Sequence, residues 1–271
     1  MAHRPDDQLQ SPETNRASSP VNDVSCPARR DREPDQHQRK SAAPPSGLPG
    51  PQPIIERFAR LLVTSDGAEA ERLAMVRQLR ESGWTLDAVV LSLFVPAARR
   101  LGDYWLDDSA TFIDVTIAIQ RLTSQLFEHE RAEAKPVGAY GGHVMLVSAP
   151  EDQHGFGIVV LEFFLRRAGW HVLSTIQTGG REVIERARHT AFDAIGFSLG
   201  HDRSIEPLRQ LIRMTRLASR NRDVAIGVGG PAIVGKPETV RALGADFSSS
   251  DAAGLVAILE NLCPGRLYNP G

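Results

Sequence analysis

Residues 144–168 read VMLVSAPEDQHGFGIVVLEFFLRRA, an apolar strand-like run followed by a glycine-containing loop and an amphipathic helix-like run. The alternation continues to the C-terminus, and the strands are apolar enough for a parallel sheet covered on both faces. Five such units predict a doubly wound, parallel five-stranded α/β domain over residues 142–264. The expected strands are 144–148, 171–176, 194–198, 224–228 and 246–249, and the expected helices are 158–168, 181–189, 205–219, 236–243 and 252–262.

Residues 54–135 show a different pattern, in which apolar residues recur at the spacings of three and four that are typical of helices. We expect Thr85 to cap a third helix, Pro96 to kink it and Gly102 to end it. A fourth and longer helix should begin at residue 108 or 109 and run to about residue 133. Four helices with short connections predict an N-terminal four-helix bundle.

Residues 1–53 have the composition of a tail. They contain no aromatic residue and hold 10 of the 18 prolines of the chain. Such a segment buries too little apolar surface to offset its ordering entropy, so we expect it to be disordered in the isolated protein.

Charge and cysteine content exclude several classes of protein. The formal net charge of −2 provides no overall positive field for a phosphate backbone, so direct DNA binding by charge is not expected. Cys26 and Cys263 match no metal-ligand spacing, which suits a reducing compartment, and we expect a cytoplasmic protein. No apolar run is long enough to span a bilayer, so no membrane association is expected.

The loop after the first predicted strand carries the strongest candidate for a binding site, because ligands of doubly wound sheets bind at the carboxyl ends of the strands. His154 follows Asp152 by two residues, so the carboxylate can orient the imidazole. Asp152 can equally cap the helix that follows. Gly155 and Gly157 remove side chains where a ligand would approach the backbone.

Two further predicted strands end in small or polar residues. The third ends at Ser198 and is followed by Gly200, and the fourth leads into Gly229 and Gly230. Together with the first loop, these residues predict a deep slot at the carboxyl edge of the sheet. Ser204 lies directly before a predicted helix, where we expect an N-cap.

The pattern of Asp152-x-His154-x-x-Gly157, Ser198 and then Gly229-Gly230 resembles the cobalamin-binding signature of methionine synthase and methylmalonyl-CoA mutase. The resemblance implies a flavodoxin-like fold in which His154 is the lower ligand of cobalt and Asp152 its partner. It implies that Ser198 contacts the buried benzimidazole and that the glycine pair lets the nucleotide tail pass close to the backbone. Some members place a relay serine at the position of Ser204, and Gly200 replaces the leucine of the family.

The helical segment resembles the cap of cobalamin sensors, in which a tryptophan at the position of Trp105 covers the upper corrin face. Light-sensing repressors carry a Glu-His pair where this chain has Val115 and Thr116. From about Ile54 to Leu262 the chain resembles the AerR/PpaA antirepressors of photosynthetic purple bacteria. The resemblance implies a light-responsive photoreceptor that binds adenosylcobalamin or hydroxocobalamin and modulates a separate DNA-binding repressor of photosynthesis genes, with indirect DNA association.

Alternative functions stay open from the sequence. One is a corrinoid carrier for methyl transfer, and another is a redox sensor that holds haem on the same fold with His154 as the axial ligand. A tail histidine, His3 or His37, could reach the upper face of the cobalt. We expect the basic run of Arg209, Arg213, Arg216, Arg220 and Arg222 to be a solvated helix face, although a partner or nucleic acid could use it. Nothing resembles a nucleophile elbow or a zinc set, so we expect no enzyme.

Overall fold

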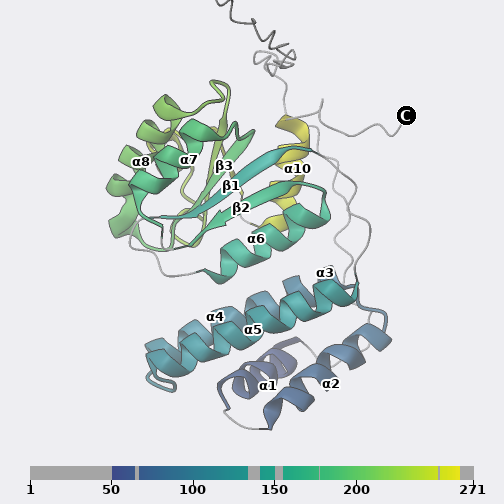
Figure 1. Ribbon diagram of the computed structural model, residues 1–271. Helices are drawn as coiled ribbons and strands as arrows, with labels where there is room; N and C mark the ends of the chain where they lie inside the picture. Colours follow the sequence, from purple (N-terminus) through teal and green to yellow (C-terminus); the bar gives the residue numbers. More distant parts are fainter. Residues whose placement is uncertain are drawn as a thin grey trace, which may run out of the picture. The chain divides into compact units, whose positions relative to one another are not determined.

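The structure, a computed structural model, describes residues 51–64, 67–133, 141–149, 155–176, 178–249 and 251–262, and these belong to one compact unit. The described residues form a group of helices followed by an α/β part (Figure 1). No helix in these ranges is both long and apolar enough to span a bilayer.

The N-terminal helices form the predicted bundle around one apolar core. Its centre includes Phe58 and Phe94, whose rings stack with their centroids 5.5 Å apart, and the fully buried side chains of Leu101 and Leu122. The helices begin three residues before the predicted start. They are α1 (Pro51–Val63), α2 (Ala68–Glu81), α3 (Leu86–Val89), the π-helical turn η1 (Val90–Phe94), α4 (Val95–Leu106) and α5 (Phe112–Ala132).

The third predicted helix is continuous through α3, η1 and α4. Thr85 caps it as expected, because its hydroxyl accepts a hydrogen bond from the backbone N–H of Ala88. Pro96 has no backbone N–H to donate to the helix. The π turn directly before it accommodates the proline, and in this turn the N–H of Val95 donates to the carbonyl of Val90. The prediction that Gly102 ends the helix is wrong, because the buried side chain of Tyr104 holds one further turn against α1.

The fourth predicted helix begins later than expected. Residues 107–110 form a turn in which the Asp107 carboxylate accepts a hydrogen bond from the backbone N–H of Ser109 and Asp108 has a left-handed φ of 57°. Thr111 is the N-cap, and its reciprocal hydrogen bonds with Asp114 form a capping box. The N-cap of this helix thus lies two to three residues after the predicted start.

The α/β part is a parallel sheet with the strand order β2-β1-β3-β4-β5. Helices α6 and α10 pack on one face, and α7, α8 and α9 pack on the other. The strands lie within two residues of their predicted bounds: β1 (His143–Ser148), β2 (His171–Thr175), β3 (Ala194–Ser198), β4 (Ala225–Gly229) and β5 (Phe247–Ser249). The helices are α6 (Phe156–Arg167), α7 (Gly180–His189), the 3-10 turn η2 (Asp202–Ser204), α8 (Ile205–Ala218), α9 (Pro237–Ala242) and α10 (Ala252–Leu262).

Helix α6 belongs to both parts of this unit. Phe163 and Phe164 of α6 lie in the same apolar cluster as the core of the bundle. Arg167 at the end of α6 forms ion pairs with Asp87 at 3.1 Å and with Glu133 at 3.3 Å. Because α6 directly follows the His154 loop, the bundle packs against the helix that this loop introduces.

Candidate functional site

The register of the sheet brings the carboxyl ends of β1, β3, β4 and β5 to one line, in which Gly229 is also paired with Ser249 of β5. Ser148 of β1 is paired with Ser198 of β3, which is paired in turn with Gly229 of β4. Ser148 is buried, whereas Ser198 and Gly229 are half-buried. The alternation of the strands places these residues on the face that carries Leu146 and α6. The structure therefore confirms that the predicted strand ends lie side by side, and it adds Ser148 to them.

Side chains of the protein itself occupy the row of the sheet below the predicted slot, and the depth of the slot stays a prediction. Gly196 and Gly227 lie one pleat below Ser198 and Gly229 on the same face. A Cβ on Gly196 would lie 3.2 Å from the side chain of Leu146, and a Cβ on Gly227 would overlap the ring of Phe247. The absent side chains of these two glycines thus make room for the protein's own residues.

The glycine pair after β4 has a structural reason that requires no ligand. Gly230 has a left-handed φ of 100°, and a Cβ there would lie 2.5 Å from the carbonyl oxygen of Leu199. At Gly229 a Cβ would lie 3.0 Å from the carbonyl oxygen of Ser249. Gly200, which follows Leu199, is half-buried. Passage of a nucleotide tail along Gly229 and Gly230 stays a prediction, since close backbone packing alone accounts for both glycines.

Ser204 occupies the N-cap position of α8 as expected, but it does not cap the helix with its side chain. Its side chain makes no capping hydrogen bond, because the turn η2 precedes α8 and already gives Ser204 a near-helical backbone (φ −89°, ψ 4°). Its hydroxyl and that of Ser148 are buried and have no hydrogen-bond partner among the described residues. An unsatisfied buried hydroxyl costs about 1–3 kcal/mol. A polar ligand at the carboxyl edge of the sheet would supply the missing partners, so these residues fit a cofactor with hydrogen-bonding groups.

The loop expected to hold the metal ligand is only partly described. Asp152 and His154 lie outside the described residues, as do His3 and His37. Gly155 directly precedes α6, where a Cβ would touch the side chain of Ile176 at 3.1 Å. Gly157 is exposed, and a Cβ there would meet no atom within 4 Å. The described residues hold no group of three potential metal ligands, so His154 stays the predicted cobalt ligand.

The cap candidates lie at the α4–α5 turn. Trp105, in the last turn of α4, is 49% exposed, and Val115 packs half-buried against the bundle core. The hydroxyl of Thr116 donates to the carbonyl oxygen of Phe112 at 2.8 Å, so its proton is used within the helix. The cap therefore places an apolar indole at the surface, and neither side chain that replaces the Glu-His pair provides a nitrogen donor.

Several apolar residues around Trp105 are exposed, which the sequence analysis did not predict. They are Leu106, Phe112, Ile113 and Ile117. The sequence does carry a signal, because two adjacent apolar residues directly after a helix cap cannot both face the core.

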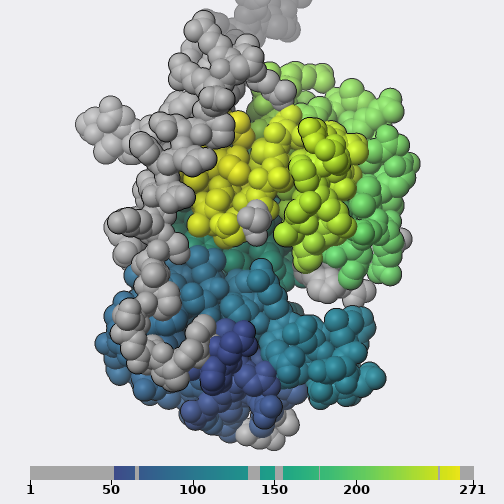
Figure 2. Space-filling view, turned by 180° about the vertical axis from the view of Figure 1, so that it is seen from behind, coloured from purple at the N-terminus to yellow at the C-terminus, as the bar shows by residue number. Residues whose placement is uncertain are grey.

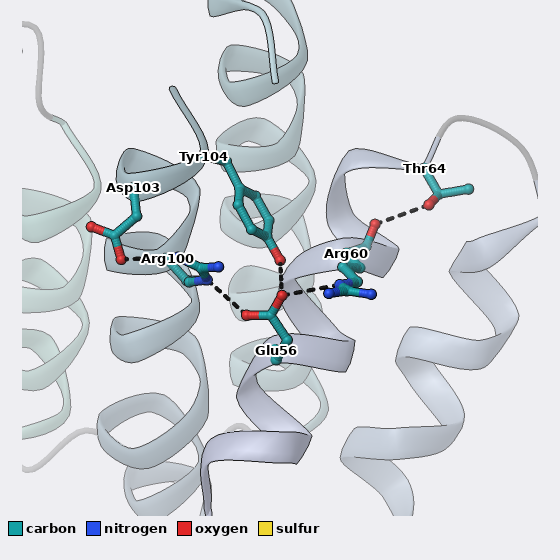
Figure 3. Close-up of polar contacts among 6 residues, drawn as sticks. All are labelled: Glu56, Arg60, Thr64, Arg100, Asp103 and Tyr104. Atoms are coloured by element: carbon teal, nitrogen blue, oxygen red, sulfur yellow. Dashed lines mark hydrogen bonds and ion pairs between the residues drawn. The ribbon is translucent and has the colours of Figure 1, made fainter. Parts of the chain in front are cut away.

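A polar network holds the last turn of α4 against α1 (Figure 3). The hydroxyl of Tyr104 donates to Glu56 Oε1 at 2.8 Å, and Nε of Arg100 donates to Glu56 Oε2 at 2.7 Å. Nε of Arg60 donates to Oε1 from one turn along α1 at 3.0 Å. The hydrogen bonds from Arg100 and then Tyr104 lower the pKa of Glu56 to about 2, against the opposing effect of desolvation. Because Trp105 follows Tyr104, this network fixes the turn that carries the indole.

Comparison with known proteins links this architecture to corrinoids. Residues 142–256 match the family model of the B12 binding domain. An uncharacterized 20.5 kDa protein from the bchF-crtJ intergenic region of Rhodobacter capsulatus is 30% identical over 161 residues, which are 58% of this chain and 83% of that protein. The monomethylamine corrinoid protein of Methanosarcina barkeri superimposes with a TM-score of 0.62 over 78% of this chain and 99% of that chain, at 17% identity. This likeness shows a shared fold.

Proposed function

The chain belongs to the AerR/PpaA-like family of cobalamin-binding proteins, and we propose on that premise that it is a light-responsive regulator of transcription. In this proposal it is an antirepressor that acts on a DNA-binding repressor of photosynthesis genes and meets DNA only through that partner. The observation that carries the proposal is the relative from the bchF-crtJ intergenic region, a photosynthesis gene cluster, which this chain matches over most of that protein's length.

Residues of the helical bundle and of the α/β part would hold the cofactor. His154 would bind cobalt from below with Asp152 as its hydrogen-bond partner, and Ser198 would face the benzimidazole. The unpaired hydroxyl of Ser148, beside Ser198 in the sheet, would supply a further hydrogen bond. Trp105 would cover the upper face from the turn that Glu56 and Tyr104 hold in place. Bound cobalamin, as adenosylcobalamin or hydroxocobalamin, supplies a chromophore for visible light and a cobalt ion with an exchangeable upper ligand.

Regulation requires that the partner distinguish two states of the loaded protein. A ligand shifts an equilibrium only by its difference in affinity for the two states. The cap suits such a difference, because Trp105 and Val115 provide largely apolar surface that would respond to the size of the upper ligand. We therefore propose a cytoplasmic regulator with no catalytic reaction of its own.

A corrinoid carrier for methyl transfer is the second candidate. The fold shared with the monomethylamine corrinoid protein favours it, since that match extends over both the helical and the α/β part. The two functions differ in what light does, because a carrier exchanges methyl groups with catalytic partners in the dark.

The absorption spectrum of the protein after incubation with adenosylcobalamin in the dark, before and after illumination, tests the proposal. Wild type is compared with His154→Ala and with His189→Ala, a control at an exposed histidine of α7. We expect wild type and His189→Ala to retain a corrinoid whose spectrum changes irreversibly on illumination, and His154→Ala to bind it more weakly. A bound corrinoid that is indifferent to light would favour the carrier, and binding of haem instead of corrinoid would refute both.

The antirepressor step needs its own assay. The repressor is bound to labelled operator DNA, and fluorescence anisotropy is followed as dark or illuminated protein is added. We expect release of the DNA by one state only. Equal effects of both states, or none, would contradict the regulatory role.

A further inference from the structure

A groove between α8 and the end of α9 has no role in the site described above. It has a volume of about 430 Å³ and lies on the face of the sheet opposite to α6 and α10. Its floor is apolar and includes Ile212, Leu217 and Leu243. Leu217 is 61% exposed, although it is a large apolar side chain. Figure 2 shows the yellow-green segment that includes α9 at the surface of the molecule.

Arginines of α8 form one wall of this groove. Arg216 is bound internally, because it donates to the carboxylate of Asp246 at 3.0 Å and to backbone carbonyls. Arg209 pairs with Glu206 at 2.8 Å, but both side chains are exposed and such a pair contributes little. Arg213 is exposed and has no ion pair or side-chain hydrogen bond with the described residues. The groove thus offers one unpaired and one readily exchanged cation above an apolar floor.

The α4–α5 turn of the same chain carries the complementary groups. Leu106 is 77% exposed and Ile113 is 67% exposed, and Ile117 lies one turn after Ile113 on the same side of α5. Between them, the carboxylate of Asp108 is exposed and has no partner among the described residues. Residues 113 and 117 lie on a different side of α5 from Val115, which packs against the bundle core.

We propose that the groove binds the α4–α5 turn of a second copy of this chain. Leu106 and Ile113 of one copy cover the floor around Leu217 of the other, and Asp108 pairs with Arg213. The apolar residues that line the groove disfavour a phosphate backbone as the occupant. Because the two surfaces differ, the contact is head-to-tail. Two copies form a closed dimer when each places its turn in the groove of the other. Otherwise, further copies add to the free groove and the free turn, and a chain of copies results.

The mass of the full-length protein at increasing concentration, measured by sedimentation velocity without cofactor, tests this contact. We expect mass to rise with concentration in wild type. Arg213→Glu should raise the dissociation constant at least about ten-fold, because it places like charges opposite each other. Leu217→Ser and Ile113→Ser, at exposed positions, should weaken association without affecting the fold. Arg181→Glu, the same charge change at an exposed arginine of α7 outside the groove, should leave association unchanged.

Charge exchange gives the decisive comparison. Arg213→Glu and Asp108→Lys should each associate weakly alone and regain association when mixed, because only the mixture contains an opposite-charge contact. Circular dichroism establishes that each variant is folded. A single monomer mass at all concentrations, or association that is unaffected by Arg213→Glu, would overturn the proposal. The assay contains neither cofactor nor repressor, so its failure leaves the proposed function untouched.

Discussion

Replacing Gly157 by alanine should stabilise the free protein and weaken its binding of cobalamin. Gly157 is the second residue of α6, and alanine is favoured over glycine in a helix by about 0.5–1 kcal/mol. A Cβ there meets no atom of the described residues within 4 Å, so none of them offsets this gain by a clash. The midpoint of thermal unfolding should rise by about 2–4 °C per kcal/mol. Gly102→Ala in α4, where a Cβ also meets no atom, should give a similar gain.

The expected loss of affinity for cobalamin has a different cause, namely the space that the added methyl group takes up. If a ligand approaches the backbone at Gly157 as the family pattern predicts, the new methyl group lies in its path, and overpacking costs about 1–3 kcal/mol. That cost corresponds to a dissociation constant raised roughly five- to 150-fold, read from absorbance titration with hydroxocobalamin. A destabilised free variant would refute the open environment of Gly157. An unchanged affinity would remove this residue from the cofactor site.

Three further changes test the fold around the site. Gly230→Ala should destabilise the protein by about 2–4 kcal/mol in denaturant titration, because it combines a left-handed backbone with a clash against Leu199; normal stability with weaker cofactor binding would contradict this reading. Glu56 has a pKa of about 2 against an ordinary 4.5, so its charge stabilises the fold above pH 4.5 and this contribution is lost as the pH falls toward 2. Glu56→Gln should therefore cost about 1 kcal/mol at neutral pH and flatten the acid limb of the stability curve, and an unchanged limb would refute it. Thr111→Ala should cost about 0.5–2 kcal/mol in the same titration, since it removes the N-cap of α5, and a neutral effect would contradict the capping box.

The strands could be predicted closely because each is a short apolar run bounded by turn residues, and their local pattern and their burial agree. Helix ends in the bundle were predicted less well. The last turn of α4 depends on the contact of Tyr104 with Glu56, which lies 48 residues away. Likewise, the start of α5 depends on whether Thr111 or an earlier residue forms the capping box. Local propensity carries no information about the first choice, whereas the spacing of Thr111 and Asp114 does signal the second.

At the carboxyl edge of the sheet, too, some features could be predicted from the sequence and others could not. The parallel topology that the sequence predicts brings the carboxyl ends of the strands to one edge, whereas the pairing of Ser198 with Gly229 comes from the structure. Ser148 could not be singled out, since its buried, unpaired hydroxyl is a property of its neighbours. The ring beside Gly227 comes from Phe247 on the next strand, so the sequence alone could not indicate it.

The glycines of the cobalamin signature therefore have two different physical causes. At Gly230 the absent side chain is required by the chain's own backbone, through Leu199, whether or not a ligand is bound. At Gly157 the described residues leave the space empty, so the fold alone provides no reason against alanine and the helix provides one in its favour. A position where the fold prefers another residue is one where a ligand has to account for the choice. Among the described residues, Gly157 and the unpaired hydroxyls of Ser148 and Ser204 are thus the features that a cofactor best explains, whereas Gly230 would be expected in any protein with this turn.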